Sequence, residues 1–294
     1  MSDRSLRSPF ARPNSYIGRT LSRDGAKRAV AGRGRYTDDF SLPRMLHAAF
    51  VRSPYAHARI AGIDASDAER HPGVALIMTG GELAKLCSGP WIGTLTCFPG
   101  MKSAPQYPMA VDRACWAGEP VAIVVARSRA EAEDAAELVR VEWEELPAVA
   151  DKAAALDGGT PVIHPALGDN LAFRKTIETG DVDGTFASAD LVIEETFEFA
   201  RHTAVSLEPR SVLAAYDKGT GKLTITTSSQ CPHMIQRVFA QTLGIPDHNV
   251  QVIAPDVGGS FGLKIHSYGD EVATAAAAIR LGRPVKFIAD RLES

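Results

Sequence analysis

The sequence predicts an α+β protein in which an α/β domain is followed by the beginning of a second, mixed α/β domain. Short apolar runs rich in Val and Ile alternate with stretches whose apolar residues recur at helical spacing. Between residues 147 and 170 the composition shifts to Ala, Gly, Asp and Pro, which is typical of a linker. A glycine-rich turn at residues 250–264, between a predicted strand and a predicted helix, organises the second part.

These shifts divide the chain into four parts. Residues 1–31 form a basic arm that lacks sustained periodicity and is expected to be extended. Residues 32–150 form the first domain, residues 151–170 the linker and residues 171–294 an incomplete second domain. We expect the boundary between the two domains near residue 155.

In the first domain, apolar β-prone runs predict strands and polar caps predict helices. Ser128 and Glu131 form a capping box, which predicts a helix that ends near Leu138. Residues 87–118 are rich in Gly and Pro and predict a long irregular loop, which in most proteins has a function. The predicted strands are 46–51, 58–63, 74–78, 121–126 and 139–143, and a short helix is predicted at 64–69.

The second part is expected to alternate strands with two helices. Residues 191–199 alternate apolar and polar side chains, which predicts a half-exposed strand. Helices are predicted at 232–243 and 270–281, each ended by a glycine, Gly244 and Gly282. Further strands are predicted at 212–216, 223–227, 250–253 and 285–288.

The composition is that of a globular protein, with 45% hydrophobic residues, 23% charged residues and a formal net charge of −3 over 294 residues. Residues 1–35 nevertheless carry nine Arg or Lys against two Asp. Because few aromatic residues are interleaved and no nucleic-acid module follows, we expect a solvated arm that lies on an acidic partner or a neighbouring subunit rather than on nucleic acid. No apolar run is long enough for a signal sequence or membrane helix, so an unanchored cytoplasmic protein is expected.

Neither the cysteines nor the histidines form a metal-binding pattern. Cys87, Cys97, Cys115 and Cys231 are too widely spaced for a zinc or iron–sulfur set and are expected to be reduced. The histidines lack the short spacings of metal sites, and no G-x-S-x-G turn indicates a serine nucleophile. We therefore expect no metal ligands from the protein, so a cofactor would have to carry any metal.

The glycine-rich turn is the first candidate for a binding site. Gly258, Gly259 and Gly262 allow positive φ angles and bring backbone N–H groups close to a phosphate, an oxo group or another oxyanion. Phe261, between glycines, could wedge against a flat ring or wall off a substrate funnel. The alternative is a plain tight turn in which Phe261 anchors the core. The turn matches neither G-x-G-x-x-G nor the P-loop, so nicotinamide and ATP binding are not indicated.

Two polar residues next to predicted strands are further candidates. Gln230 follows a strand and can present a donor and an acceptor to a ligand. The alternative for Gln230 is a surface or helix-capping residue. Glu208, held beside Pro209, could orient a substrate. The alternative for Glu208 is an ordinary surface ion pair with Arg210.

Six motifs taken together resemble the molybdenum-binding large subunit of the xanthine dehydrogenase and aerobic carbon monoxide dehydrogenase family. They are GRGRYTDD at 32–39, LHAAFVRSPYAHA at 46–58, GEPVA at 118–122, EPR at 208–210, SQ at 229–230 and APDVGGSFG at 254–262. The resemblance runs in register from about residue 18 to the last residue, and the order and spacing of the motifs carry it.

This resemblance implies a hammerhead-like first domain and the beginning of a molybdopterin-binding domain. It implies a molybdenum hydroxylase that oxidises an aldehyde, an N-heterocycle or a related small molecule by attack of a metal-bound hydroxide and hydride transfer. The implied cofactor is molybdenum–molybdopterin, in its cytosine dinucleotide form. Electrons would leave through an iron–sulfur subunit with 2Fe–2S clusters and an FAD-binding subunit.

Carried over to this sequence, the resemblance implies two groups of site residues. Those that contact the molybdenum centre are Gly258, Gly259, Phe261, Gly262 and the catalytic Gln230. Glu208 is implied to line the substrate pocket and is the second catalytic candidate. Backbone amides and an uncharged Gln suit metal-bound oxygen atoms, which agrees with the absence of protein metal ligands.

The sequence departs from the family in two ways. Ser260 and Leu263 stand where the family loop usually has glycine, and either side chain could narrow the approach. Family subunits are also more than twice as long, and their general-base glutamate and most pterin contacts would fall beyond Ser294. We therefore expect an amino-terminal part that is inactive alone and needs the rest of the subunit. The alternative is a non-catalytic assembly or binding module that keeps the fold without the chemistry.

Overall fold

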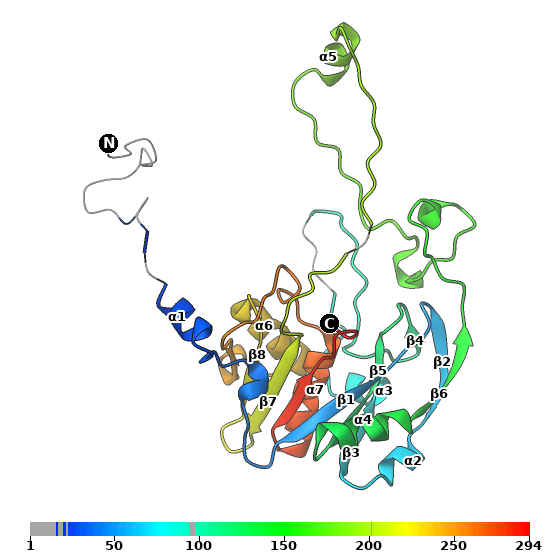
Figure 1. Cartoon of the computed structure of the whole chain (residues 1–294). Helices are drawn as coiled ribbons and strands as arrows, with labels where there is room; N and C mark the ends of the chain where they lie inside the picture. Colours follow the sequence, from blue (N-terminus) through cyan, green and yellow to red (C-terminus); the bar gives the residue numbers. More distant parts are fainter. Residues whose placement is uncertain (1–15, 17–19, 22, 94–97, 201) are drawn as a thin grey trace. The chain divides into compact units, whose positions relative to one another are not determined.

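The computed structural model describes residues 16, 20–21, 23–93, 98–200 and 202–294, which Figure 1 draws in colour. The chain divides into two compact units, Met1–Arg35 and Tyr36–Ser294. Cys97 and most of the amino-terminal arm lie outside the described residues, so what the sequence predicts for them stays a prediction. No described helix is long and apolar enough to cross a membrane.

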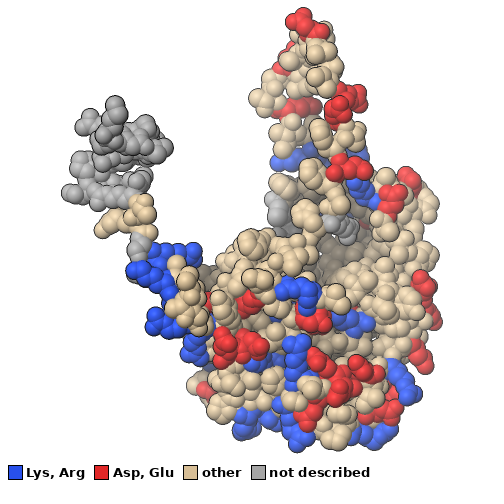
Figure 2. All heavy atoms as spheres, in the orientation of Figure 1, with Lys and Arg blue, Asp and Glu red and all other residues tan. Residues whose placement is uncertain are grey.

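The first unit contains a helix where we expected extended chain. Helix α1 spans Asp24–Val30 and has Lys27 and Arg28 in its last turn, and Figure 2 shows basic side chains gathered on it. The expectation was wrong here because Ala, Lys and Arg are strong helix formers even without an apolar stripe. Periodicity indicates a buried face, and residues 25–30 of this helix are all exposed.

A seven-stranded mixed sheet is the centre of the second unit, with strand order β3-β5-β1-β10-β7-β8-β9. The pairs β1–β10 and β8–β9 are parallel, and the other neighbours are antiparallel. The strands are β1 (Leu46–Arg52), β3 (Val74–Thr79), β5 (Pro120–Ala126), β7 (Ser211–Asp217), β8 (Lys222–Thr227), β9 (Val250–Ile253) and β10 (Val285–Ile288). All of these strands were predicted from their apolar runs.

Strand β10 joins the two predicted domains in one sheet. Val285 is paired with Leu46 of β1 on one side and with Ala214 of β7 on the other. The strands before and after the predicted linker, residues 151–170, therefore belong to one continuous sheet. That segment is irregular and contains the short 3-10 turns η2 (Ala154–Leu156) and η3 (Pro165–Leu167). Whether the two parts fold separately stays a prediction.

A smaller sheet and several helices complete the amino-terminal half. Its order is β4-β2-β6, from Arg113–Ala114, Ala58–Asp64 and Arg140–Glu145. Helix α4 (Arg129–Glu137) begins as predicted, because the Ser128 side chain accepts the N–H of Glu131. The remaining short elements are η1 (Thr37–Asp39), α2 (Ser66–Glu69) and α3 (Gly80–Ala84).

The core lies between the large sheet and two helices, α6 (Pro232–Leu243) and α7 (Gly269–Leu281). In α7 every residue from Asp270 to Ala278 is buried, and most of them are alanine. Alanine side chains are short, so this helix can pack closely against β7 and β10, beside which Figure 1 shows it. Its amino terminus follows the glycine-rich stretch at residues 250–264, which begins with β9 and is preceded by η4 (Asp247–Asn249).

The predicted strand at residues 191–199 is wrong. These residues pair with no strand in the described part of the chain, and helix α5 (Val182–Ser188) precedes them. Ile193 and Phe197 are 75% and 80% exposed. Their alternation with polar residues favours extended chain, but a strand also needs a hydrogen-bonded neighbour, which the described residues do not provide.

Candidate functional site

The glycine loop, defined here as residues 258–262, connects β9 to the segment before α7. A Cβ atom on Gly258 would lie 2.4 Å from the Cβ of Glu208, because the segment before β7 packs directly against the loop. Gly259 has φ +98°, and its Cβ would lie 3.1 Å from the Cβ of Ser206. Close packing therefore requires glycine at Gly258, and the positive φ favours glycine at Gly259.

Phe261 does not anchor the core. Its side chain is 81% exposed and its φ is +51°, a left-handed conformation that is strained for a bulky residue. Such strain costs about 1–3 kcal/mol and is concentrated at functional sites. The tight-turn alternative with a buried Phe261 is therefore wrong, and the ring is presented to whatever meets the loop.

The side-chain amide of Gln230 is held in one orientation by the glycine loop. Its Oε1 accepts hydrogen bonds from the N–H of Gly262 (3.2 Å) and from the Oγ–H of Ser260. Because both of these groups are donors, the atom that faces them must be the amide oxygen, so the amide nitrogen Nε2 points the other way. Nε2 has no acceptor among the described residues. Gln230 also does not cap α6, whose amino terminus has no side-chain cap. Ser260 thus orients Gln230.

Three consecutive backbone amides in the loop have no acceptor in the described part of the chain. The N–H groups of Gly258 and Gly262 donate to Glu208 and Gln230. In contrast, those of Gly259, Ser260 and Phe261 have no acceptor within the described residues. Together with Nε2 of Gln230 they form a set of donors without acceptors, which suits a ligand rich in oxygen.

Glu208 holds the loop from the other side. Its Oε2 accepts the N–H of Gly258 (2.7 Å) and the Nζ–H of Lys264 (2.9 Å), and its own N–H donates to the carbonyl of Gly258 (3.1 Å). Its Oε1 is buried and has no partner among the described residues. Glu208 does not pair with Arg210, so the surface-pair alternative is wrong.

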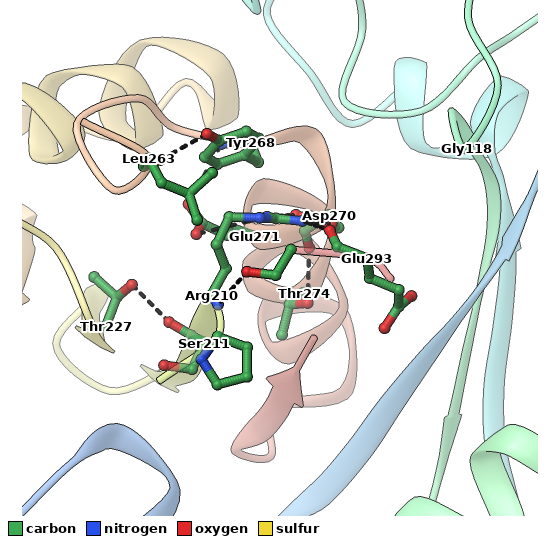
Figure 3. Close-up of polar contacts among 12 residues, drawn as sticks. Gly118, Arg210, Ser211, Thr227, Leu263, Tyr268, Asp270, Glu271, Thr274 and Glu293 are labelled. Carbon is green, nitrogen blue, oxygen red and sulfur yellow. Dashed lines mark hydrogen bonds and ion pairs between the residues drawn. The ribbon is translucent and has the colours of Figure 1, made fainter. Parts of the chain in front are cut away.

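Arg210, from the same short motif, ties β7 to α7 (Figure 3). Its guanidinium donates to both carboxylate oxygens of Asp270, at 2.7 and 2.8 Å, and to the carbonyl of Glu293. It also stacks on the ring of Tyr268 at 4.0 Å. Tyr268 in turn donates its hydroxyl to the carbonyl of Leu263 (2.6 Å), the residue that follows the loop.

The charged side chains around Arg210 and Asp270 are largely buried. Arg52 adds a second ion pair to Asp270, at 3.0 Å. Burial raises the pKa of the neighbouring Glu271 to about 7, and Arg210 lowers it only in part. Arg52, Lys264, Asp270 and Glu271 were not predicted as site residues from the sequence. The sequence gives little indication that these charged residues are buried, because a charged residue can be predicted to be buried only when its partners are known.

Two cavities lie near these elements. The first, of about 250 Å³, is lined by residues that include Arg52, Arg210 and Tyr268. The second, of about 430 Å³, is lined by several residues within 104–119 and 163–167, among them Glu119. Neither cavity is lined by Gln230, Glu208 or the glycine loop. The substrate-pocket role of Glu208 therefore stays a prediction.

The described residues contain no group of His, Cys, Asp and Glu that could hold a metal ion. Cys87, Cys115 and Cys231 are free thiols, as predicted. The groups at the glycine loop that lack an acceptor among the described residues, Nε2 of Gln230 and the amides of residues 259–261, are instead neutral hydrogen-bond donors. This set can bind the oxygen atoms of a group that brings its own metal ligands.

Two family models match the chain in succession. Residues 31–147 match the α/β hammerhead domain of aldehyde oxidase and xanthine dehydrogenase, and residues 163–294 match a molybdopterin cofactor-binding domain. The glycine loop, Gln230 and Glu208 all lie within the second match.

Similar proteins cover nearly all of the chain. It is 38% identical to the nicotine 6-hydroxylase large subunit of Paenarthrobacter nicotinovorans over 95% of its residues, and 37% identical to the carbon monoxide dehydrogenase large chain of Afipia carboxidovorans over 91%. Each match covers 34% of the relative, so the chain spans about a third of the length of these relatives.

Solved structures give the same result. Quinoline 2-oxidoreductase from Pseudomonas putida 86 matches 93% of the chain with a TM-score of 0.87 and 39% identity, over 34% of its own chain. The aldehyde oxidoreductase of Desulfovibrio gigas matches 91% of the chain with a TM-score of 0.82 and 32% identity, over 30% of its own chain.

Proposed function

Because the chain belongs to the molybdenum-binding large-subunit family of xanthine dehydrogenase and aerobic carbon monoxide dehydrogenase, we propose that it forms the amino-terminal part of a molybdenum hydroxylase subunit. In this proposal, Gln230 and the glycine loop contact the molybdenum–molybdopterin cofactor. The observation that carries the proposal is the set of unpaired donors: Nε2 of Gln230 and the amides of Gly259, Ser260 and Phe261.

These donors fit the cofactor in three respects. They are uncharged, so they can bind oxygen atoms on the metal or phosphate without adding charge to it. They come from backbone and from an amide whose orientation is already fixed, so binding requires little reorganisation. Gly258 leaves no room for a Cβ atom and Gly259 leaves little, which lets the loop pack on residues 206–208 while the amides of residues 259–261 remain available.

The exposed Phe261 is the second element of the proposal. Its strained backbone and its 81% exposed ring are explained if the ring packs on the cofactor or forms one wall of the substrate approach. Glu208 has one buried oxygen without a partner, Oε1, which could accept a hydrogen bond from a bound group. We keep the substrate-orienting role of Glu208 as part of the proposal on this ground.

When bound, the cofactor would supply hydroxylation chemistry, in which a substrate loses two electrons and gains an oxygen atom from water. The substrate class we propose is an aldehyde, an N-heterocycle or a related small molecule. Nicotine 6-hydroxylase, quinoline 2-oxidoreductase and aldehyde oxidoreductase are among the similar proteins and support this range. The cytosine dinucleotide form of the cofactor is proposed with it.

The proposal also includes partners. Electrons would pass to an iron–sulfur subunit with 2Fe–2S clusters and to an FAD-binding subunit, and a further polypeptide segment would complete the subunit. Relatives described as large subunits or large chains, about three times the length of the matched region, support this. The isolated chain is then expected to be inactive.

The test is metal and cofactor analysis of the complex that the chain forms in the cells that encode it. The chain is tagged, purified under native conditions and assayed for molybdenum, pterin, iron and flavin per chain. We expect all four to co-purify, together with turnover of an aldehyde or N-heterocycle. A stable complex without molybdenum and pterin would overturn the proposal and favour a non-catalytic assembly module.

A further inference from the structure

We propose that Lys264 is a positioning residue that holds the glycine loop in the conformation that presents its free amides and Gln230. The inference rests on the proposed function for its consequence, but its geometric part can be tested without any cofactor. It starts from the number of separate segments that meet at this one residue.

Lys264 connects three parts of the chain that are distant in sequence. Its Nζ donates to Oε2 of Glu208 before β7, at 2.9 Å. Its carbonyl accepts the N–H of Gln230 (3.1 Å) and the hydroxyl of Ser229 (3.3 Å), both after β8. Its own N–H donates to Oγ of Ser260, at 3.2 Å. The residue thus joins both supporting segments to the loop.

The side chain of Lys264 is deeply buried, with 1% of its surface exposed. Burial lowers its pKa, and the hydrogen bond and charge of Glu208 oppose that change. A buried ammonium needs a fixed partner, and here the partner oxygen is the same atom that accepts the N–H of Gly258. Moving the amine would therefore release the carboxylate that fixes the first residue of the loop.

The consequences reach Gln230 through Ser260. The hydroxyl of Ser260 donates to Oε1 of Gln230 while it accepts the N–H of Lys264. If the backbone of Lys264 shifts, Ser260 loses this donor and its hydroxyl is held less firmly against Gln230, whose Oε1 then depends more on the N–H of Gly262. The same residue thereby controls the start of the loop and the amide that lies against its end.

A second buried lysine offers a matched control. Lys286, in β10, is also buried and pairs with the carboxylate of Asp38 at 2.9 Å, and its Nζ donates to the carbonyls of Asp38 and Phe40. It has no contact with the glycine loop. Lys286→Met therefore removes a buried ammonium without touching the loop.

The experiment is hydrogen exchange of the full chain, read on peptides that cover residues 256–265. Lys264→Met is expected to speed exchange of the bonded amides of Gly258, Gly262 and Lys264 by about tenfold or more. Lys264→Arg, which keeps the charge, should restore most of the protection. Lys286→Met should leave these amides at the wild-type rate, even if it lowers Tm.

A double variant separates positioning from stability. Replacing both partners, as Lys264→Met with Glu208→Leu, removes the buried charges together and should recover much of the Tm lost in Lys264→Met. The loop amides should nevertheless exchange fast, because neither the carboxylate nor the amine remains. Wild-type exchange in Lys264→Met, or in the double variant, would overturn the proposal.

The purified complex supplies the second readout. Lys264→Met should lower the molybdenum retained per chain by about tenfold, as loss of outer contacts does at other metal sites, and Lys286→Met should not. Fast loop exchange with no molybdenum even in the wild-type complex would leave the positioning role intact and refute the proposed function. Fast exchange with unchanged molybdenum retention would refute the role of Lys264 in presenting the site.

Discussion

Arg210 and Asp270 form a buried two-point ion pair that fixes the start of β7 against the first turn of α7. The side chains are 5% and 2% exposed. Burial by itself would raise the pKa of Asp270, but Arg210 and Arg52 outweigh it and hold this pKa below its usual range. Since Arg210 also stacks on Tyr268, which binds the carbonyl of Leu263, the pair supports the carboxyl end of the glycine loop.

Arg210→Met is expected to lower the free energy of unfolding by about 3–5 kcal/mol, because it leaves the carboxylate of Asp270 buried with one partner fewer. Urea denaturation at pH 7 measures the loss. Arg129→Met is the control, since Arg129 and Glu133 form an exposed pair whose removal should cost about 0.5 kcal/mol or less. Equal losses of unfolding free energy in the two variants would mean that the ion pair with Arg52 is enough to stabilise the buried carboxylate of Asp270.

Glu119→Gln should stabilise the protein increasingly as the pH rises. Burial raises the pKa of Glu119 to about 7, above its value in the unfolded chain. Such a group reduces stability as pH rises from about 4.5 to 7, because the folded state binds the proton more tightly than the unfolded state. The variant keeps an oxygen that can accept the N–H of Cys115, which Glu119 accepts at 2.6 Å.

Denaturation of the wild type and of Glu119→Gln at pH 4 and at pH 8 checks the direction of this pH dependence. At pH 4 the carboxyl is protonated in both states, so the difference should be small. At pH 8 the variant should be more stable by up to about 3 kcal/mol. Glu271, whose pKa is also raised to about 7, changes the stability of the wild type and of the variant equally with pH, so it does not affect the difference. A difference that does not change between the two pH values would contradict the raised pKa.

Phe261→Gly should not destabilise the chain. Its ring is 81% exposed, so no cavity is left, and glycine relieves the strain of the left-handed backbone by about 1 kcal/mol. Gly259→Ala is the matched comparison, since φ +98° and the 3.1 Å approach to Ser206 should make it destabilising by about 1–3 kcal/mol. Urea denaturation of both variants measures this, and a marked loss in Phe261→Gly would place the ring in a packed environment.

The sequence allowed the fold class, the family and nearly all strands to be predicted, because buried strands and capped helices are encoded locally. Strand β5, with every residue buried, is the clearest case. The clusters of charge were not predictable, since Arg210, Asp270 and Arg52 are far apart in sequence and meet only after the sheet forms.

The three candidates from the sequence lie together, because Glu208 and Gln230 accept the N–H groups of Gly258 and Gly262. Their roles at a bound cofactor or substrate stay predictions. What the motifs could not show is the way the residues hold one another. Ser260 had been expected only to narrow the approach, whereas its hydroxyl orients Gln230. The predicted strand at 191–199 is wrong for a different reason, because its alternating pattern is right but no described strand lies beside it.

The apolar side chains of residues 191–199 should make the chain associate. Ile193 and Phe197 are 75% and 80% exposed, so the contact is expected to be apolar. Ile193→Lys with Phe197→Lys should shift the sedimentation profile toward monomer and leave Tm unchanged. A monomeric wild type at about 50 µM would contradict this expectation.

The role of Gln230 can be separated from its effect on the loop by two substitutions in the purified complex. Gln230→Glu keeps an oxygen that can accept from Ser260 and Gly262 but replaces the Nε2 donor, whereas Gln230→Ala removes both. If Nε2 stabilises charge on a bound oxygen, both variants should lower kcat by on the order of tenfold to a hundredfold at matched molybdenum content. Only Gln230→Ala should also loosen the loop in hydrogen exchange.

Gln236 provides the control for this pair of variants. It lies on α6, and its Nε2 donates to the carbonyls of Asp247 and Val250, away from the loop. Gln236→Ala should therefore lower Tm without changing kcat. If kcat falls in Gln230→Ala but not in Gln230→Glu, the residue acts only by holding the loop, because the acceptor oxygen would then account for its whole effect.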